Sequence, residues 1–197
     1  MTARLDGVEL EMEALGALED GEAARRALMP LVEEYRAWIE ARRSELGALI
    51  PRRQETAESL LHDAGIAATR IEAGIAVLEA HPDALHAFCV ANRAVGRALR
   101  KRLSKDVQPS WRVFQLAFLL LNLEGVEDPT HPRREIVDLL FFPTGGGKTE
   151  AYLGLAAFTM VLRRLRNPGL TSAGVSVLMR YTLRLLTLDQ LGRAAGL

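Results

Sequence analysis

The stretch IVDLLFFPTGGGKTEAYLGLAAFTMVLRRLR, from Ile136 to Arg166, decides the fold that the sequence predicts. Its first part, Ile136–Phe142, is nearly all apolar and precedes three glycines, which is typical of a buried parallel strand. Its last part, Lys148–Arg166, is a helix-forming segment. A second apolar run, Gly174–Met179, and a second helical pattern, 182–195, follow it. Strand, helix, strand and helix in this order predict the start of an α/β fold with a parallel sheet.

The glycines between the first strand and helix predict a phosphate-binding loop. Glycine tolerates positive φ, so consecutive backbone N–H groups can turn toward one anion, and the following helix adds the positive end of its dipole. A lysine there can contact the outer phosphates, and a threonine hydroxyl can bind Mg²⁺. Glycine normally stands six residues before the lysine, where this chain has Phe142. The predicted ATP-binding residues of this loop are Thr144, Gly145, Gly146, Gly147, Lys148 and Thr149.

The sequence before this stretch predicts helices. Residues 22–46 place apolar side chains at helical spacing, Pro51 and Pro82 each favour a helix start, and Gly65 is a predicted helix end. Residues 110–123 predict one more short helix. We therefore expect a helical N-terminal region over residues 1–106, and an incomplete nucleotide-binding domain over residues 107–197.

The charges are unevenly placed along a chain of zero formal net charge. Residues 1–96 contain 10 basic and 17 acidic residues, whereas five basic residues and no acid fall in residues 97–105. Five basic side chains at a helix end favour a solvated terminus that complements the helix dipole, and DNA contact is the second interpretation. The only cysteine, Cys89, is predicted to be buried and inert. A cytoplasmic protein with no membrane partner is expected, because the sequence has neither a signal-peptide pattern nor a long apolar span.

Three motifs resemble those of superfamily 2 helicases and translocases. The segment PTGGGKT resembles their first motif, and WRVFQ resembles the upstream signature whose glutamine, here Gln115, contacts adenine. A glutamine amide can donate and accept at once, as that role requires. The segment VSVLMRYTLRLL resembles the next motif, so the resemblance implies that Tyr181, Thr182 and Arg184 contact the DNA backbone without sequence preference. The same resemblance implies a RecA-like P-loop domain, of which this chain would hold only the start.

The resemblance is closer to one branch of that superfamily, the helicase-like proteins of DISARM anti-phage systems. It covers about residues 92–195 and includes the long insertion between Gln115 and the glycine loop. It implies an ATP hydrolase that uses ATP and Mg²⁺, with Lys148 and Thr149 in the catalytic machinery. It also implies DNA and other DISARM proteins, DrmB among them, as partners.

Two groups that such an enzyme needs are absent from the sequence. No adjacent acidic pair follows Thr149, where Glu150 and Asp189 are the only acids, and no second nucleotide-binding domain supplies an arginine finger. We therefore expect the N-terminal fragment of a larger protein, inactive as a hydrolase by itself. The alternatives are another P-loop NTPase, such as a small kinase, and a helical adaptor with a vestigial loop.

Overall fold

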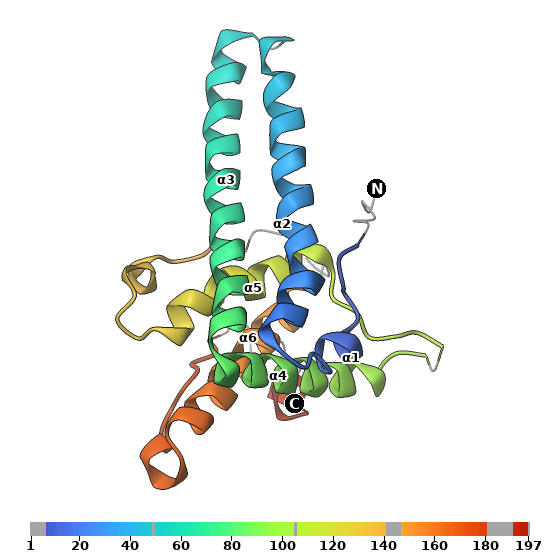
Figure 1. Ribbon diagram of the computed structural model, residues 1–197, viewed down its shortest axis with the longest axis vertical. Helices are drawn as coiled ribbons and strands as arrows, with labels where there is room; N and C mark the ends of the chain where they lie inside the picture. Colours follow the sequence, from blue (N-terminus) through green and yellow to red (C-terminus); the bar gives the residue numbers. More distant parts are fainter. Residues whose placement is uncertain (1–6, 49, 105, 141–146, 181–190, 197) are drawn as a thin grey trace.

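The computed structural model describes residues 7–48, 50–104, 106–140, 147–180 and 191–196. Within these ranges the regular elements are helical (Figure 1). The longer helices are α2 (Gly21–Ser44), α3 (Pro51–Ala80), α4 (Pro82–Arg100), α5 (Val113–Glu127) and α6 (Lys148–Arg166). Shorter ones are α1 (Met12–Leu15) and the 3-10 turns Leu46–Ala48, Pro132–Glu135 and Gly169–Ser172.

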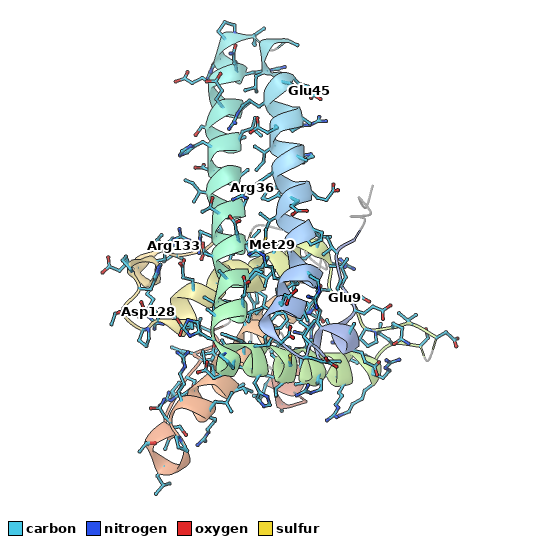
Figure 2. The ribbon with its side chains drawn as sticks, viewed as in Figure 1. Glu9, Met29, Arg36, Glu45, Asp128 and Arg133 are labelled. Atoms are coloured by element: carbon cyan, nitrogen blue, oxygen red, sulfur yellow. The ribbon has the colours of Figure 1, made fainter. Side chains whose placement is uncertain are left out.

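Helices α2 and α3 form an antiparallel hairpin that extends well beyond the rest of the molecule (Figure 1). The hairpin begins at Asp20, whose carboxylate accepts a hydrogen bond of 2.7 Å from the Ala23 N–H and so caps α2. Arg36, halfway along the hairpin, donates to the Glu72 carboxylate at 2.6 Å (Figure 2). The far half is held by its own apolar cluster, which is separate from the main core and consists of Ile39, Leu46, Leu61 and Ala68.

The main core lies where the base of the hairpin meets α4, α5 and α6. The chain passes from α3 to α4 through the single residue His81, and Pro82 starts α4 at a position where its missing N–H costs no bond. Fully buried side chains from five helices meet in this core, including Leu28, Leu78, Phe88, Leu116 and Phe158. The core therefore joins residues from both of the predicted regions, 1–106 and 107–197.

Two glycines let helices approach closely in this core. A Cβ on Gly74 in α3 would lie 1.9 Å from the Leu120 carbonyl oxygen of α5, so only glycine permits this crossing. A Cβ on Gly154 in α6 would lie 2.7 Å from Cη2 of Trp111, whose ring packs on that helix. The first contact fixes α5 against the hairpin, and the second fixes α6 against Trp111, which lies just before α5.

The α/β fold class predicted from the sequence is wrong for the residues that the structure describes. The part of the first predicted strand that is described, 136–140, and the whole second one, Gly174–Met179, form no strand, and no parallel sheet of a RecA-like domain is present in the described ranges. The single β pairing there is an isolated antiparallel bridge between Glu11 and Ser110.

The physical reason lies in what surrounds the apolar runs. A strand needs a neighbouring strand to pair its backbone, and apolar strand side chains need a layer that covers them. Val137 is 92% exposed and Leu139 is 85% exposed, so nothing covers them. The run is held instead by Arg70 of α3, which makes two bonds of 2.5 and 2.6 Å to the Asp138 carboxylate.

The helix predictions fared better. The bounds of α6 and the start of α4 at Pro82 are confirmed, and α2 and α5 form where the apolar periodicity predicts them. The predicted helix end at Gly65 is wrong, because α3 continues through that residue to Ala80. Gly65 is a half-buried position inside the helix and not a turn, and a Cβ there would meet nothing within 4 Å.

Candidate functional site

The candidate site begins where α6 begins. Gly147 is the N-cap residue, with φ of 85°, the left-handed conformation that favours glycine. Lys148 and Thr149 are half-buried residues of the first helical turn. The first N–H groups of a helix have no partner within it, and the helix dipole is positive at this end. The start of α6 thus combines the backbone donors, the cation and the hydroxyl that suit a phosphate with its Mg²⁺.

Gln115, in the first turn of α5, links the start of α6 to the WRVFQ segment, which is predicted to contact adenine. Its Nε2 donates to the Gly147 carbonyl oxygen at 2.7 Å, and its Oε1 accepts from the Arg112 N–H at 2.7 Å. The side chain is only 4% exposed. One buried amide therefore joins the N-terminal ends of α5 and α6, which are separated by 32 residues in the sequence.

Gly147 is required at its position for two independent reasons. Its positive φ strains any residue with a side chain, and a Cβ there would lie 2.7 Å from the Gln115 Nε2 atom. A substitution would both strain the backbone and push away the amide that holds the carbonyl.

Behind Gln115, a buried pair supports the start of α5. The Trp111 indole N–H donates to Oδ1 of Asn92 at 2.7 Å, and Asn92 in turn donates to the Phe88 carbonyl oxygen at 2.9 Å. Both side chains are almost fully buried. Because each buried polar atom is satisfied, the pair fixes the approach of the chain to α5 at little cost in desolvation.

A charged cluster lies beside the first turn of α6. Glu150 pairs with Arg193 and lies 3.6 Å from Arg102 at the end of α4. The Glu150 and Arg193 side chains are 14% and 16% exposed, so the pair is largely removed from solvent. These residues line a pocket of about 340 Å³ together with Leu153. The pocket lies between α6, the C-terminal end of α4 and residues 192, 193 and 196.

The structure places some predicted site residues and leaves others outside the described ranges. It brings Gln115 to the glycine loop, and it puts Lys148 and Thr149 at the start of α6. Outside the described residues lie Thr144, Gly145, Gly146, Tyr181, Thr182 and Arg184. Their predicted roles stay predictions.

The sequence did not predict the side chains that support the candidate site, which are Asn92 and the Glu150–Arg193 ion pair. No sequence pattern marked Asn92 as the partner of Trp111. The available clue was that Trp111 belongs to the WRVFQ motif and that a buried indole N–H needs a hydrogen-bond acceptor. The Glu150–Arg193 pair joins residues 43 positions apart, which no local pattern reveals. Cys89 is buried, as predicted, and burial raises the pKa of its thiol. Among the described residues no helix is long and apolar enough to cross a membrane.

Comparison with known proteins gives one informative match. No family model matches the chain. Its sequence is 40% identical over 182 residues to the "DISARM protein DrmA" of Bacillus paralicheniformis (strain ATCC 9945a / NCIMB 11709 / CD-2). The matched region covers 83% of this chain but only 16% of that much longer protein. The resemblance to DISARM proteins is thus confirmed, and the match identifies the chain as a relative of the DISARM protein DrmA that spans 16% of its length.

Proposed function

We propose that this chain is part of an ATP-dependent DNA helicase or translocase that acts in an anti-phage defence system of the DISARM type. The observation that carries the proposal is the bond between Gln115 and Gly147 at the start of α6, because it unites two helicase-like motifs at one point. The similarity to DrmA supports the defence role.

In this proposal the residues at the start of α6 hold the phosphates of ATP. Lys148 contacts the outer phosphates, the Thr149 hydroxyl binds Mg²⁺, and backbone N–H groups of the loop and the first turn surround the anion. Gln115 serves first to hold the Gly147 carbonyl. Recognition of adenine by the same buried amide requires the base to replace one of its two internal bonds.

Hydrolysis is proposed to need groups from the rest of the longer protein. The acid nearest to the loop, Glu150, is engaged with Arg193 and Arg102 and is not one of an adjacent acidic pair. Phosphoryl transfer requires groups that position water and neutralise developing charge. The 197-residue chain is therefore expected to bind Mg·ATP without turnover.

Titration with a fluorescent ATP analogue and Mg²⁺ tests this function directly. Lys148→Ala is expected to weaken binding at least about tenfold, since a charge-assisted contact to phosphate is lost. Arg26→Ala is the matched control, because it removes one positive charge from an exposed site on α2. Equal binding by both variants and the unchanged chain would contradict a nucleotide site at α6.

Adenine selectivity is a separate property of the proposed site. Gln115→Ala is expected to reduce the preference for ATP over GTP in competition with the same analogue. If the preference is unchanged while total affinity falls, Gln115 only positions Gly147.

DNA and other DISARM proteins such as DrmB are the proposed partners. Tyr181, Thr182 and Arg184 are proposed to contact DNA phosphates, so binding should be independent of sequence and should weaken with salt. In the longer protein, Arg184→Ala is expected to weaken binding alike on unrelated DNA sequences. A sequence-selective loss would contradict a backbone contact.

A helical adaptor without nucleotide binding is the second candidate function. The observation in its favour is that the described residues form helices and no sheet, with a hairpin that extends from the core (Figure 1). Absence of binding in the Mg·ATP titration, with the chain folded, would select the adaptor.

A further inference from the structure

One face of α4 carries a line of basic side chains. Arg93, Arg97, Arg100 and Lys101 follow one another at intervals of four, three and one residues, and all four are exposed. At 3.6 residues per turn, these positions fall within an arc of about 100°. We call these four residues the basic stripe. The structure divides the basic run seen in the sequence, because Arg102 turns instead toward Glu150.

The basic stripe lines a groove of about 760 Å³ between α4 and α1. Helix α1 lies beside the C-terminal half of α4 (Figure 1). The approach is close at Gly16, where a Cβ would lie 2.7 Å from Cγ of Arg93. The Arg93 guanidinium donates to the Gly16 carbonyl oxygen, so this arginine is held in place at one end of the stripe.

The groove carries an uncompensated positive charge. Among the described residues that line it, Glu13 is the single acid, and its carboxylate is engaged with Arg100 at 3.2 Å. Arg97 and Lys101 have no carboxylate partner within the part of the chain that the structure describes. Two cations therefore face the groove with no carboxylate among the described residues to neutralise them. An anionic ligand would gain their attraction without first breaking an ion pair.

The spacing of the stripe favours an extended polyanion over a single ion. Arg93, Arg97 and Lys101 stand one helical turn apart, at intervals of about 6 Å along the axis, and the stripe is about 12 Å long. A membrane surface fits less well, since the groove's lining includes none of the exposed large apolar side chains that would enter lipid. A row of cations in a recess suits the consecutive phosphates of one nucleic-acid strand.

We propose that the groove between α1 and α4 binds the sugar–phosphate backbone of single-stranded DNA, with Arg97 and Lys101 as the principal phosphate contacts. The choice of DNA over another polyanion rests on the proposed function. The inference that the groove binds phosphates rests only on its shape and its charge. The described residues that line the groove are different from the predicted DNA contacts Tyr181, Thr182 and Arg184, and the proposed contact requires no nucleotide at α6.

Fluorescence anisotropy of a labelled oligothymidine, measured with the 197-residue chain across a salt series and without ATP, tests the proposal. Replacement of Arg97 and Lys101 together by glutamine is expected to weaken binding at least about tenfold and to lower the log–log salt slope by about 1.4, since two single-strand phosphate contacts are lost. The matched control replaces Arg52 and Arg53 by glutamine, two exposed arginines of α3 in the far half of the hairpin. The control should keep both affinity and slope.

Three results would overturn the inference. Equal losses in the two double variants would assign binding to overall charge. No binding by the unchanged chain would exclude the groove as a DNA site, and equal competition by polyglutamate would assign it to acidic proteins. Circular dichroism of each variant shows whether it is folded. The Mg·ATP titration, in which the Arg97/Lys101 variant should match the unchanged chain, separates failure of this inference from failure of the nucleotide site.

Discussion

Gly74 shows how one residue sets the distance between two helices. Its hydrogen side chain allows α3 to contact the Leu120 carbonyl of α5, where a Cβ would lie at 1.9 Å. Gly74→Ala is expected to lower the free energy of unfolding by at least about 2 kcal/mol, because a backbone must move to accept the methyl group. Urea denaturation followed by circular dichroism measures the change.

Gly65→Ala on the same helix is the control for that substitution. A methyl group at Gly65 meets nothing within 4 Å, and alanine favours the helix over glycine. The expected effect is a gain of about 0.5–1 kcal/mol. A similar loss at both positions would show that glycine itself, and not the crossing, determines stability.

Asp83 connects the start of α4 to the end of α6. It accepts a bond of 2.5 Å from Arg166, and this bond is the main reason why the pKa of Asp83 is lowered. A lowered pKa means that the ionised carboxylate stabilises the fold above the unfolded value of about 3.9, and that this contribution disappears as the pH falls through the lower folded value.

Asp83→Asn should therefore destabilise the chain at pH 7, and the difference from the unchanged chain should narrow below about pH 4. Urea denaturation at pH 7, 5 and 3 measures the loss of stability at pH 7 and its decrease at low pH. Asp63→Asn, at an exposed position of α3, should show little difference at any of these pH values. A deficit in Asp83→Asn that stays constant with pH would show that the charge of Asp83 is not the cause.

At the scale of elements, the hairpin has two parts with different support. Its base belongs to the main core, whereas its far half depends on the small cluster around Leu61 (Figure 2, where Glu45 marks the far part). Leu61→Ala is expected to open the far half locally, since few apolar contacts hold it. Hydrogen exchange should accelerate in residues 36–68 and stay unchanged in α4 and α6.

Leu78→Ala in the main core is the contrasting variant. Leu78 is fully buried, and its loss should cost about 2–5 kcal/mol and accelerate exchange in all helices. If Leu61→Ala also accelerates exchange throughout, the hairpin and the core unfold as one unit.

The 136–140 segment has no regular secondary structure and is tied to helix α3 by the ion pair between Arg70 and Asp138. Arg70 and Asp138 are 11% and 23% exposed in their side chains, so this pair is better shielded than a surface pair. Asp138→Asn is expected to cost about 1–3 kcal/mol, because a charged hydrogen bond is weakened and Arg70 is left without its counter-ion. Glu135→Gln, an exposed neighbour, should change the free energy of unfolding by less than about 0.5 kcal/mol.

For the whole molecule, local patterns predicted the helices but not the way in which they assemble. The end of α6 was predictable because Asn167, Pro168 and Gly169 stop a helix, and Pro82 marks a start. An apolar run such as 136–140 has the composition of a buried strand wherever it lies. Whether it pairs depends on neighbours that its own residues do not specify.

The same division holds for the candidate site. Lys148 and Thr149 could be placed from their spacing, because loop and helix are contiguous. The hydrogen bond between Gln115 and Gly147 was not predicted, because the resemblance assigned Gln115 only to adenine and 32 residues separate the two in the sequence. The basic stripe needed the structure, because Arg93 lies outside the run that stood out in the sequence and Arg102 faces elsewhere.

The Gln115 amide has a consequence for how this chain can change during evolution. It holds the N-terminal ends of α5 and α6 together by hydrogen bonds. The geometry of the site therefore does not depend on the length of the connection from α5 to α6. Lengthening a flexible connection is inexpensive, at about 0.6 kcal/mol for each doubling. Insertions between Asp128 and the glycine loop can therefore accumulate and acquire new roles, while Gly147 and Lys148 keep their geometry.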